Sequence, residues 1–213
     1  GHDYAAPVRF PWKDPSMGRL LDDPEFLAHP RARASEGRRR LLAHLEAQGF
    51  DRARPQTIVD IGWRGTIQDN LARATGCALD GRYLGLFGFV FPQPEGSGKS
   101  GYVFDENDGR GFIGNQEVAP FEMICNAPGG SVLGYEAGPE GVRAVRETHP
   151  GEERSIAESS LPVQEGVAAA IGEVVDHVDR HGLTSAELRP LALALARATL
   201  ADPPAALADA FFA

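Results

Sequence analysis

The stretch from Gln56 to Phe91 constrains the fold more than any other part of the chain. It opens with a short apolar, β-branched run and passes through a turn containing Gly62 and Gly65. An amphipathic run to Gly76 follows, and the stretch closes with the apolar segment Tyr83–Phe91. A strand, a glycine-punctuated turn, a helix ending at glycine and a second strand make one βαβ unit. The sequence therefore predicts an α/β fold with a Rossmann-like, mostly parallel sheet.

The charge balance restricts the classes of partner. The chain has 30 acidic and 21 basic residues and a formal net charge of −9, whereas nucleic acids and anionic membranes require a basic surface. Cys77 and Cys125 are the only cysteines, too few for a disulfide framework, and no apolar run is long enough to span a bilayer. We expect a cytoplasmic protein without nucleic-acid partners or a membrane span.

The first residues indicate a piece of a longer protein. The chain of 213 residues begins with Gly1-His2 in place of a methionine, which we interpret as the remnant of a cleaved tag. We therefore expect an upstream domain of the same polypeptide as a partner, and this domain can complete any half-site found here.

Three segments are expected along the chain. Residues 1–34 contain five prolines with aromatic residues between them, which favours an irregular arm. Residues 35–150 are predicted to form the Rossmann-like domain, with an antiparallel hairpin around Gly138–Gly141 at the edge of its sheet. Residues 151–213 are predicted to form C-terminal helices that pack on this domain.

The C-terminal segment changes to a helical period of apolar residues. Residues 150–160 are polar and predicted to be a linker, and the helix that begins near Leu161 is expected to end at Gly182. A Thr184–Glu187 capping box is expected to start the next helix. Its predicted buried face consists of Leu188, Leu191 and Leu195.

The tripeptide Gly98-Lys99-Ser100 invites comparison with a phosphate-binding loop. That motif also needs a glycine five positions before Gly98, where this chain has Gln93, and a helix after Ser100, where Tyr102–Phe104 is strand-like. A plain connection between strands is therefore favoured. His177 and His181 have the spacing of a shared metal site on one helix, but no third ligand is evident, so we predict no metal site.

The turn between the first strand and its helix is the best candidate site. Ligands of open α/β sheets bind at the carboxyl ends of strands, where helix N-terminal amides favour an anion. Asp60 can accept from a hydroxyl or act as a base, Arg64 can donate charge-assisted hydrogen bonds, and Trp63 can stack. Each also has a structural alternative, as a turn cap or a core residue. The expected phosphate-binding or ligand-binding residues of the turn are Gly62, Trp63, Arg64, Gly65, Thr66 and Gln68.

Other nucleotide-binding families share part of this pattern. A dinucleotide site requires a third glycine and an acidic residue at the end of the second strand, but Tyr83–Phe91 contains no acid. The segment Val59–Gly62 is closer to the start of a methyltransferase, although the same missing acid removes the expected contact to ribose. A SAM-dependent methyltransferase is therefore the weaker alternative.

Three segments together resemble one known family. Ile58–Gln68, Tyr83–Leu86 and Phe121–Tyr135 are similar to the C-terminal region of haloacid-dehalogenase-like proteins found with bacterial surface-polysaccharide biosynthesis genes. The resemblance covers roughly residues 35–135. The phosphatase half of such proteins uses an Asp-x-Asp nucleophile segment, which we do not find in this chain. What the resemblance implies is a companion domain that handles a sugar, a sugar phosphate or a nucleotide sugar.

The two longer motifs supply polar groups that we expect to converge on one pocket. Asp60 and Glu122 are the candidate catalytic residues, as base or hydroxyl acceptor, and Asn126 and Ser131 are candidate ligand-binding residues. The alternative for Glu122 is a charge that the helix dipole favours. The expected function is glycosyl or phosphosugar transfer in surface-polysaccharide biosynthesis, with a non-catalytic ligand-binding or docking module as the alternative. The sequence identifies no cofactor.

Overall fold

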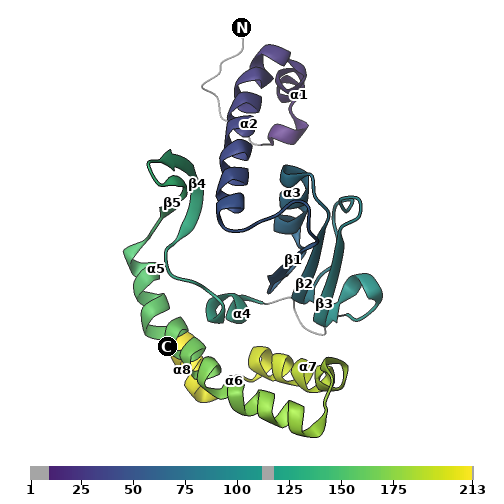
Figure 1. The fold of residues 1–213 in the computed structure, drawn as a ribbon, viewed down its shortest axis with the longest axis vertical. Coiled ribbons are helices and arrows are strands. Elements are labelled where there is room, and N and C mark those ends of the chain that lie inside the picture. Colours follow the sequence, from purple (N-terminus) through teal and green to yellow (C-terminus); the bar gives the residue numbers. More distant parts are fainter. Residues whose placement is uncertain (1–9, 112–117, 213) are drawn as a thin grey trace. The chain divides into compact units, whose positions relative to one another are not determined.

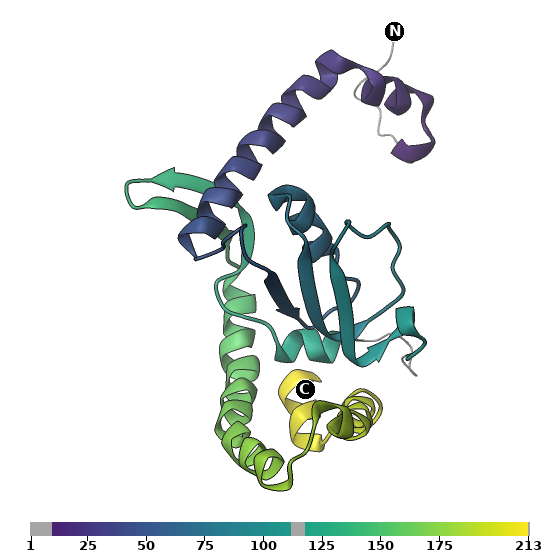
Figure 2. The ribbon, with the colours of Figure 1, turned by 45° about the vertical axis from the view of Figure 1, so that its right-hand side comes forward.

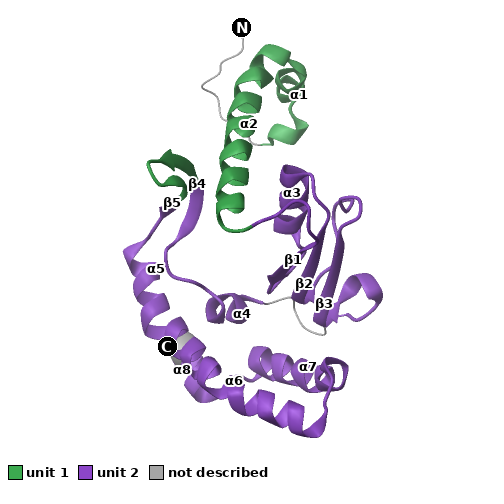
Figure 3. Ribbon diagram, viewed as in Figure 1, with its two compact units in different colours: residues 1–49, 134–144 green, residues 50–133, 145–213 purple. Residues whose placement is uncertain are grey.

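The computed structural model describes residues 10–111 and 118–212. The fold is α/β, with a parallel sheet, an antiparallel hairpin and C-terminal helices (Figure 1). The chain divides into two compact units, and Figure 3 shows residues 1–49 with 134–144 as one unit and residues 50–133 with 145–213 as the other. The expected boundaries after residues 34 and 150 do not coincide with these units.

The first unit contains helices where an irregular arm was predicted. Helices α1 (Pro15–Asp22) and α2 (Pro24–Ala47) follow the short 3₁₀ turn η1 (Pro11–Lys13). The side chains of Asp14 and Asp23 cap α1 and α2 by accepting hydrogen bonds from backbone amides two residues further on. Proline at the first helical position loses no intrahelical hydrogen bond and fixes φ at a helical value. Two of the prolines therefore start helices, and the prediction was wrong because it treated them as helix breakers.

The predicted hairpin is present as β4 (Ser131–Gly138) and β5 (Gly141–Glu147). It forms a two-stranded sheet of its own and does not join the edge of the parallel sheet, which corrects the expected position. Within the first unit, its tip is bonded to α2: Arg40 donates to the Tyr135 carbonyl at 3.0 Å, and the His44 ring nitrogen lies 3.1 Å from the Val142 carbonyl. These contacts explain why the tip belongs to the same unit as α2.

The second unit contains the predicted βαβ core. β1 (Gln56–Asp60), α3 (Thr66–Thr75) and β2 (Leu79–Leu86) are followed by β3 (Gly98–Asp105) and the turn η2 (Glu106–Asp108). The three strands are parallel in the order β1-β2-β3, and Figure 2 shows them side by side. This confirms the α/β prediction and the helix end at Gly76, which has a left-handed backbone.

The second strand occupies residues 79–86, not the predicted Tyr83–Phe91. Pairing with β1 starts at Leu79 opposite Gln56 and has reached Tyr83 by the end of β1. Beyond Leu86 the chain leaves the sheet: Phe87 is buried in the core, whereas Val90 and Phe91 are exposed. The apolar content of this segment correctly predicted that part of it is buried. It did not determine which of its residues pair with β1.

The second unit also contains α4 (Ala119–Ile124), and its C-terminal helices are α5 (Pro150–Ser155), the π-turn η3 (Ile156–Ser160), α6 (Leu161–His181), α7 (Ser185–Ala201) and α8 (Ala205–Phe212). The helix end at Gly182 and the Thr184–Glu187 capping box are confirmed. The predicted polar linker at 150–160 is helical instead. Ile156 and Ser160 are buried, and the Ser160 hydroxyl donates to the Met123 carbonyl of α4 at 2.8 Å, so this segment is anchored by tertiary contacts.

Helix α7 packs on β3 through a different face from the one predicted. Its buried residue is Ala196, which joins Phe87, Val103 and Phe104 in the core, whereas the side chain of Leu195 is 59% exposed. The Tyr102 hydroxyl of β3 donates to the Ser185 carbonyl at 2.8 Å and fixes the start of α7. Within the described residues, no helix has both the length and the apolar character needed to cross a membrane.

Substitution of two leucines tests this arrangement of the core. Leu86 is 0% exposed, so Leu86→Ala is expected to lower the free energy of unfolding by about 2–5 kcal/mol through lost burial and a cavity. Leu195→Ala is the matched control on an exposed site and is expected to change it by less than about 0.5 kcal/mol. Urea unfolding followed by circular dichroism measures both, and equal losses would contradict the packing of α7.

Candidate functional site

The turn after β1 lies against the end of β2. The Gly85 amide donates to the Ile61 carbonyl at 3.1 Å, and the Phe87 amide donates to the Trp63 carbonyl at 2.7 Å. Gly62 has φ of +140°, and a Cβ atom at this position would collide with the carbonyl oxygen of Gly85. Glycine is therefore required at position 62 both for its conformation and for its close approach to β2.

Trp63 connects the turn with α4. Its indole nitrogen donates to the Glu122 carboxylate at 2.9 Å, so the two sequence motifs do meet at one point. Its ring stacks on Phe104 with a centroid distance of 5.9 Å and an interplanar angle of 9°, and the Phe87 ring centroid is also 5.9 Å away. Trp63 is partly buried and packs against the core, which is close to the structural alternative given for it.

The side chain of Arg64 is bound to the protein. One terminal nitrogen donates to the Gly88 carbonyl, and the guanidinium carbon lies 5.9 Å from the centroid of the Phe87 ring. A guanidinium has five N–H donors, so this contact leaves capacity for an additional acceptor. In this structure the residue fixes the segment after β2 to the turn.

Gln68 supports the turn from inside the fold. Its side chain is 0% exposed, donates to the carbonyls of Leu79 and Gly98 at 2.8 Å each, and accepts a hydrogen bond of 2.7 Å from the Tyr83 hydroxyl. Burial, reinforced by the nearby carboxylates of Asp60 and Asp69, raises the pKa of Tyr83 above its ordinary value. The expected contact between Gln68 and a ligand does not fit this burial, since its polar groups are bonded within the sheet.

Sequence analysis did not assign Lys99 and Asp69 to the site. The Lys99 ammonium lies 2.7 Å from the Asp69 carboxylate and donates to the Arg64 carbonyl at 3.1 Å. The sequence feature that could have pointed to Lys99 as a residue near the site is the Gly98-Lys99-Ser100 tripeptide. The comparison with a phosphate loop is correctly rejected, because Lys99 lies in β3 and no helix follows it. The residue nevertheless contacts the turn from a neighbouring strand.

Among the described residues, the Asp60 carboxylate and the first amides of α3 are groups of the turn without a protein partner. Asp60 is half-buried at the carboxyl end of β1, opposite Tyr83 in the sheet. In the described part of the chain, its carboxylate makes no hydrogen bond or ion pair. α3 starts after Gly65, which has no side chain to cap the helix, and Thr66 is exposed. The turn thus has an acceptor at its start and uncapped amide donors at its end.

The remaining predicted site residues belong to their own segments. The Asn126 side chain accepts from the Ala127 amide at 3.0 Å, and its carbonyl accepts from Gln164. Ser131 is exposed at the start of β4. Among the described residues, no hydrogen bond joins Asn126 or Ser131 to the turn. Of the three predicted residues outside the turn, the structure therefore brings only Glu122 into contact with it.

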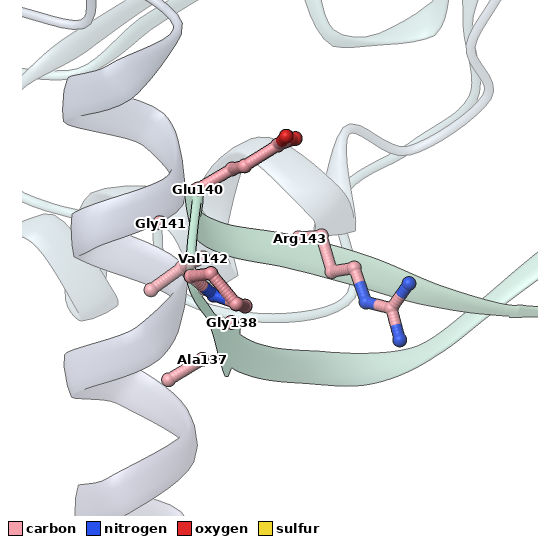
Figure 4. Close-up of a pocket in the computed structure, with 7 residues that line it drawn as sticks. Ala137, Gly138, Glu140, Gly141, Val142 and Arg143 are labelled. Carbon is pink, nitrogen blue, oxygen red and sulfur yellow. The ribbon is translucent and has the colours of Figure 1, made fainter.

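Two other regions were considered as sites. A hollow of about 550 Å³ at the tip of the β4–β5 hairpin is lined by residues 137–143, and Figure 4 shows the charged ends of Glu140 and Arg143 extending in different directions. The rings of His177 and His181 are 4.5 Å apart, but in residues 10–111 and 118–212 no three His, Cys, Asp or Glu side chains form a group able to hold a metal ion. Neither region has a carboxylate joined through a short turn to the uncapped amides of a helix, as the turn after β1 does.

Comparison with known proteins adds no family assignment. No protein-family model matches the chain, and a search of curated proteins finds no significant relative. The resemblance given by the three segments around the turn therefore stays an expectation.

Replacement of Gly62 tests the close approach of the turn to β2. Gly62→Ala is expected to lower the free energy of unfolding by at least about 1–3 kcal/mol, because the new Cβ meets a backbone carbonyl and φ is unfavourable. Gly172→Ala, in α6 with open space around it, is the control and should raise stability by about 0.5–1 kcal/mol. Chemical unfolding of both proteins checks this, and a neutral Gly62→Ala would contradict the geometry.

The raised pKa of Tyr83 predicts a dependence of stability on alkaline pH. The unfolded chain ionises this tyrosine near pH 10, whereas the folded chain keeps it protonated. The unfolded state then binds fewer protons, so stability falls as the pH rises above about 10. Tyr83→Phe is expected to show a shallower fall than the wild type between pH 9 and 11 in urea unfolding. Parallel curves would contradict the burial of this hydroxyl.

Proposed function

We propose that this chain binds a phosphorylated sugar or a nucleotide sugar at the turn after β1, as part of glycosyl or phosphosugar transfer in surface-polysaccharide assembly. The observation that carries the proposal is that the half-buried Asp60 carboxylate, without a partner in the described residues, begins the turn that ends at the uncapped first amides of α3. Helix N-terminal amides bind anions, and a carboxylate accepts hydrogen bonds from sugar hydroxyls. A ligand with both a phosphate and hydroxyls satisfies both groups.

The proposed roles follow from the contacts of each side chain. The amide of Thr66, at the exposed start of α3, binds the phosphate, and Asp60 accepts from a sugar hydroxyl and acts as the base when that hydroxyl is the attacking group. Glu122, exposed on α4 and bonded to Trp63 by one oxygen, places a second carboxylate near the turn. Trp63, Arg64 and Gln68 shape the backbone that carries these groups.

A non-catalytic ligand-binding or docking module is the second candidate. It is favoured by the engagement of Arg64 with the Gly88 carbonyl and of Glu122 with Trp63, since both side chains already have protein partners. Binding of a nucleotide sugar by this chain without its turnover supports this candidate over the first.

Ligand binding before and after removal of the Asp60 charge tests the proposal. The wild type is expected to gain stability with a nucleotide sugar or sugar phosphate, by about 2.7 kcal/mol at a ligand concentration of 100 times Kd. Asp60→Asn should weaken this binding about tenfold or more, because a charge-assisted hydrogen bond contributes about 1.5–3 kcal/mol. Binding of inorganic phosphate, which contacts only the amides, should be undiminished. Isothermal titration calorimetry measures each affinity.

Asp80→Asn provides the matched control. This carboxylate lies at the start of β2 and pairs with Arg82 at 2.6 Å on the surface, so its loss removes the same charge away from the turn. The proposal is wrong if neither a sugar phosphate nor a nucleotide sugar binds the wild type, or if Asp60→Asn and Asp80→Asn have the same affinity.

A further inference from the structure

Helix α6 carries an apolar stripe that is open to solvent. The side chains of Val167, Ile171 and Val174 are each 58% exposed, Val175 is 49% exposed, and Val178 is half-buried. Single exposed apolar residues are common on protein surfaces, but several on one face of a helix mark an interaction surface. In water, a helix is stabilised mainly by packing of its apolar face. This stripe therefore indicates a partner for α6.

The same face of α6 is already a packing surface at the start of the helix. Gln164 precedes Ile171 by seven residues, so the two lie on one side of the helix. The Gln164 side chain donates to the carbonyls of Ile124 and Asn126 at 2.7 Å each, and α4 contacts α6. The face is thus covered near Gln164 and becomes exposed from Val167 onwards. The stripe continues a buried surface beyond the end of its internal partner.

The spacing within the stripe is that of a coiled-coil seam. Val167, Ile171, Val174 and Val178 follow one another at intervals of four, three and four residues, which are the intervals of the a and d positions of a heptad. The positions that flank this seam hold uncharged or small residues: Ala168, Ala170, Val175 and His177. The carboxylates and the arginine of α6 occupy the remaining positions: Glu165, Glu173, Asp176, Asp179 and Arg180. A second helix can therefore approach the seam without burying a carboxylate or a guanidinium.

The seam is complementary to itself in an antiparallel pair. A two-fold axis between positions 172 and 173 brings Val167 of one copy opposite Val178 of the other, and Ile171 opposite Val174. Residue i then contacts residue j and j contacts i, as an interface between two identical copies requires. The spacing of the four residues is symmetric about this point, so every apolar layer of the seam is filled.

The charges of α6 also favour the antiparallel orientation. In that orientation Glu165 lies at the same level as Arg180 of the second copy, and the helix dipoles oppose each other. In a parallel pair each carboxylate lies at the level of its own copy, so that like charges face like charges. The apolar spacing and the charge pattern thus select the same occupant, an α6 helix in the opposite direction.

We propose that α6 forms the interface of a homodimer, in which the seam of Val167, Ile171, Val174 and Val178 packs antiparallel on the same seam of a second copy. The seam extends over about 16 Å of helix at a rise of 1.5 Å per residue. This is a small contact, which places the dimer among weak interfaces with micromolar affinity. None of the four residues belongs to the turn after β1, so the inference does not depend on the proposed function.

Sedimentation velocity of the full chain tests the interface. The wild type is expected to be a monomer at low concentration and mostly a dimer at about 500 µM, which exceeds a micromolar Kd. Ile171→Lys/Val174→Lys places like charges opposite each other in the seam. It should weaken dimerisation at least about tenfold, because burying an unpaired charge is costly. A wild type that stays monomeric at this concentration overturns the proposal.

Ala169→Lys/Gly172→Lys is the matched control. It adds the same two charges at the same spacing to another face of α6, and it should dimerise as the wild type does. All four substituted sites are exposed, so both double variants are expected to keep the helical circular dichroism spectrum of the wild type. Equal dimerisation of the two double variants overturns the assignment of the seam.

Distances between spin labels test the orientation without altering the seam. In a background with Cys77→Ser and Cys125→Ser, a label is attached to Glu165→Cys or to Gly172→Cys. The antiparallel dimer places the two labels at position 165 about 22 Å apart along the helix axis, whereas the two labels at position 172 lie close together. A parallel pair brings the labels close together at both positions. A dimer with close labels at both positions, or at neither, overturns the inference.

Discussion

The buried pair of Lys99 and Asp69 is the interaction on which the centre of the larger unit depends. It joins β3 to α3, and the hydrogen bond between Gln68 and Tyr83 joins the same helix to β2. An ion pair in the interior is strongly destabilised when its partners separate, because each charge then remains without compensation. α3 therefore cannot slide or rotate on the sheet without a large cost. The position of its first turn, and of the amides that the turn presents, follows from this constraint.

The parts of the fold that the sequence predicted correctly are those with local signals. Gly76 and Gly182 end helices because a left-handed residue terminates a helix within one turn, and Thr184 with Glu187 forms a capping box within four residues. The helices of residues 15–34 also had local signals, an aspartate followed by a proline at each start. The signal for these helices was therefore present in the sequence, but the prolines were interpreted as helix breakers and not as residues of the first helical turn.

The parts that the sequence did not predict depend on partners far along the chain. Trp63 and Glu122 are 59 positions apart, and Gln68 and Tyr83 are 15 apart, so nothing local distinguishes a ligand-binding side chain from one that is bonded inside the fold. The prediction of the buried face of α7 was wrong for a similar reason. Leu195 and Ala196 are both apolar. Which of them faces the core depends on how the start of the helix packs on β3.

At the turn, one set of groups holds the backbone in place and a different set is left to bind a ligand. The polar side chains of Trp63, Arg64 and Gln68 are bonded to the protein, and the groups left for a ligand are backbone amides and the Asp60 carboxylate. Two negative unit charges 4 Å apart repel each other by about 4 kcal/mol at an effective dielectric constant of 20, so a bare anion close to this carboxylate is disfavoured. The repulsion falls when the ligand holds its negative charge away from the atoms that meet Asp60. A sugar phosphate does so, since its ring separates the phosphate from hydroxyls that donate to a carboxylate, and this favours a phosphorylated sugar over a simple anion.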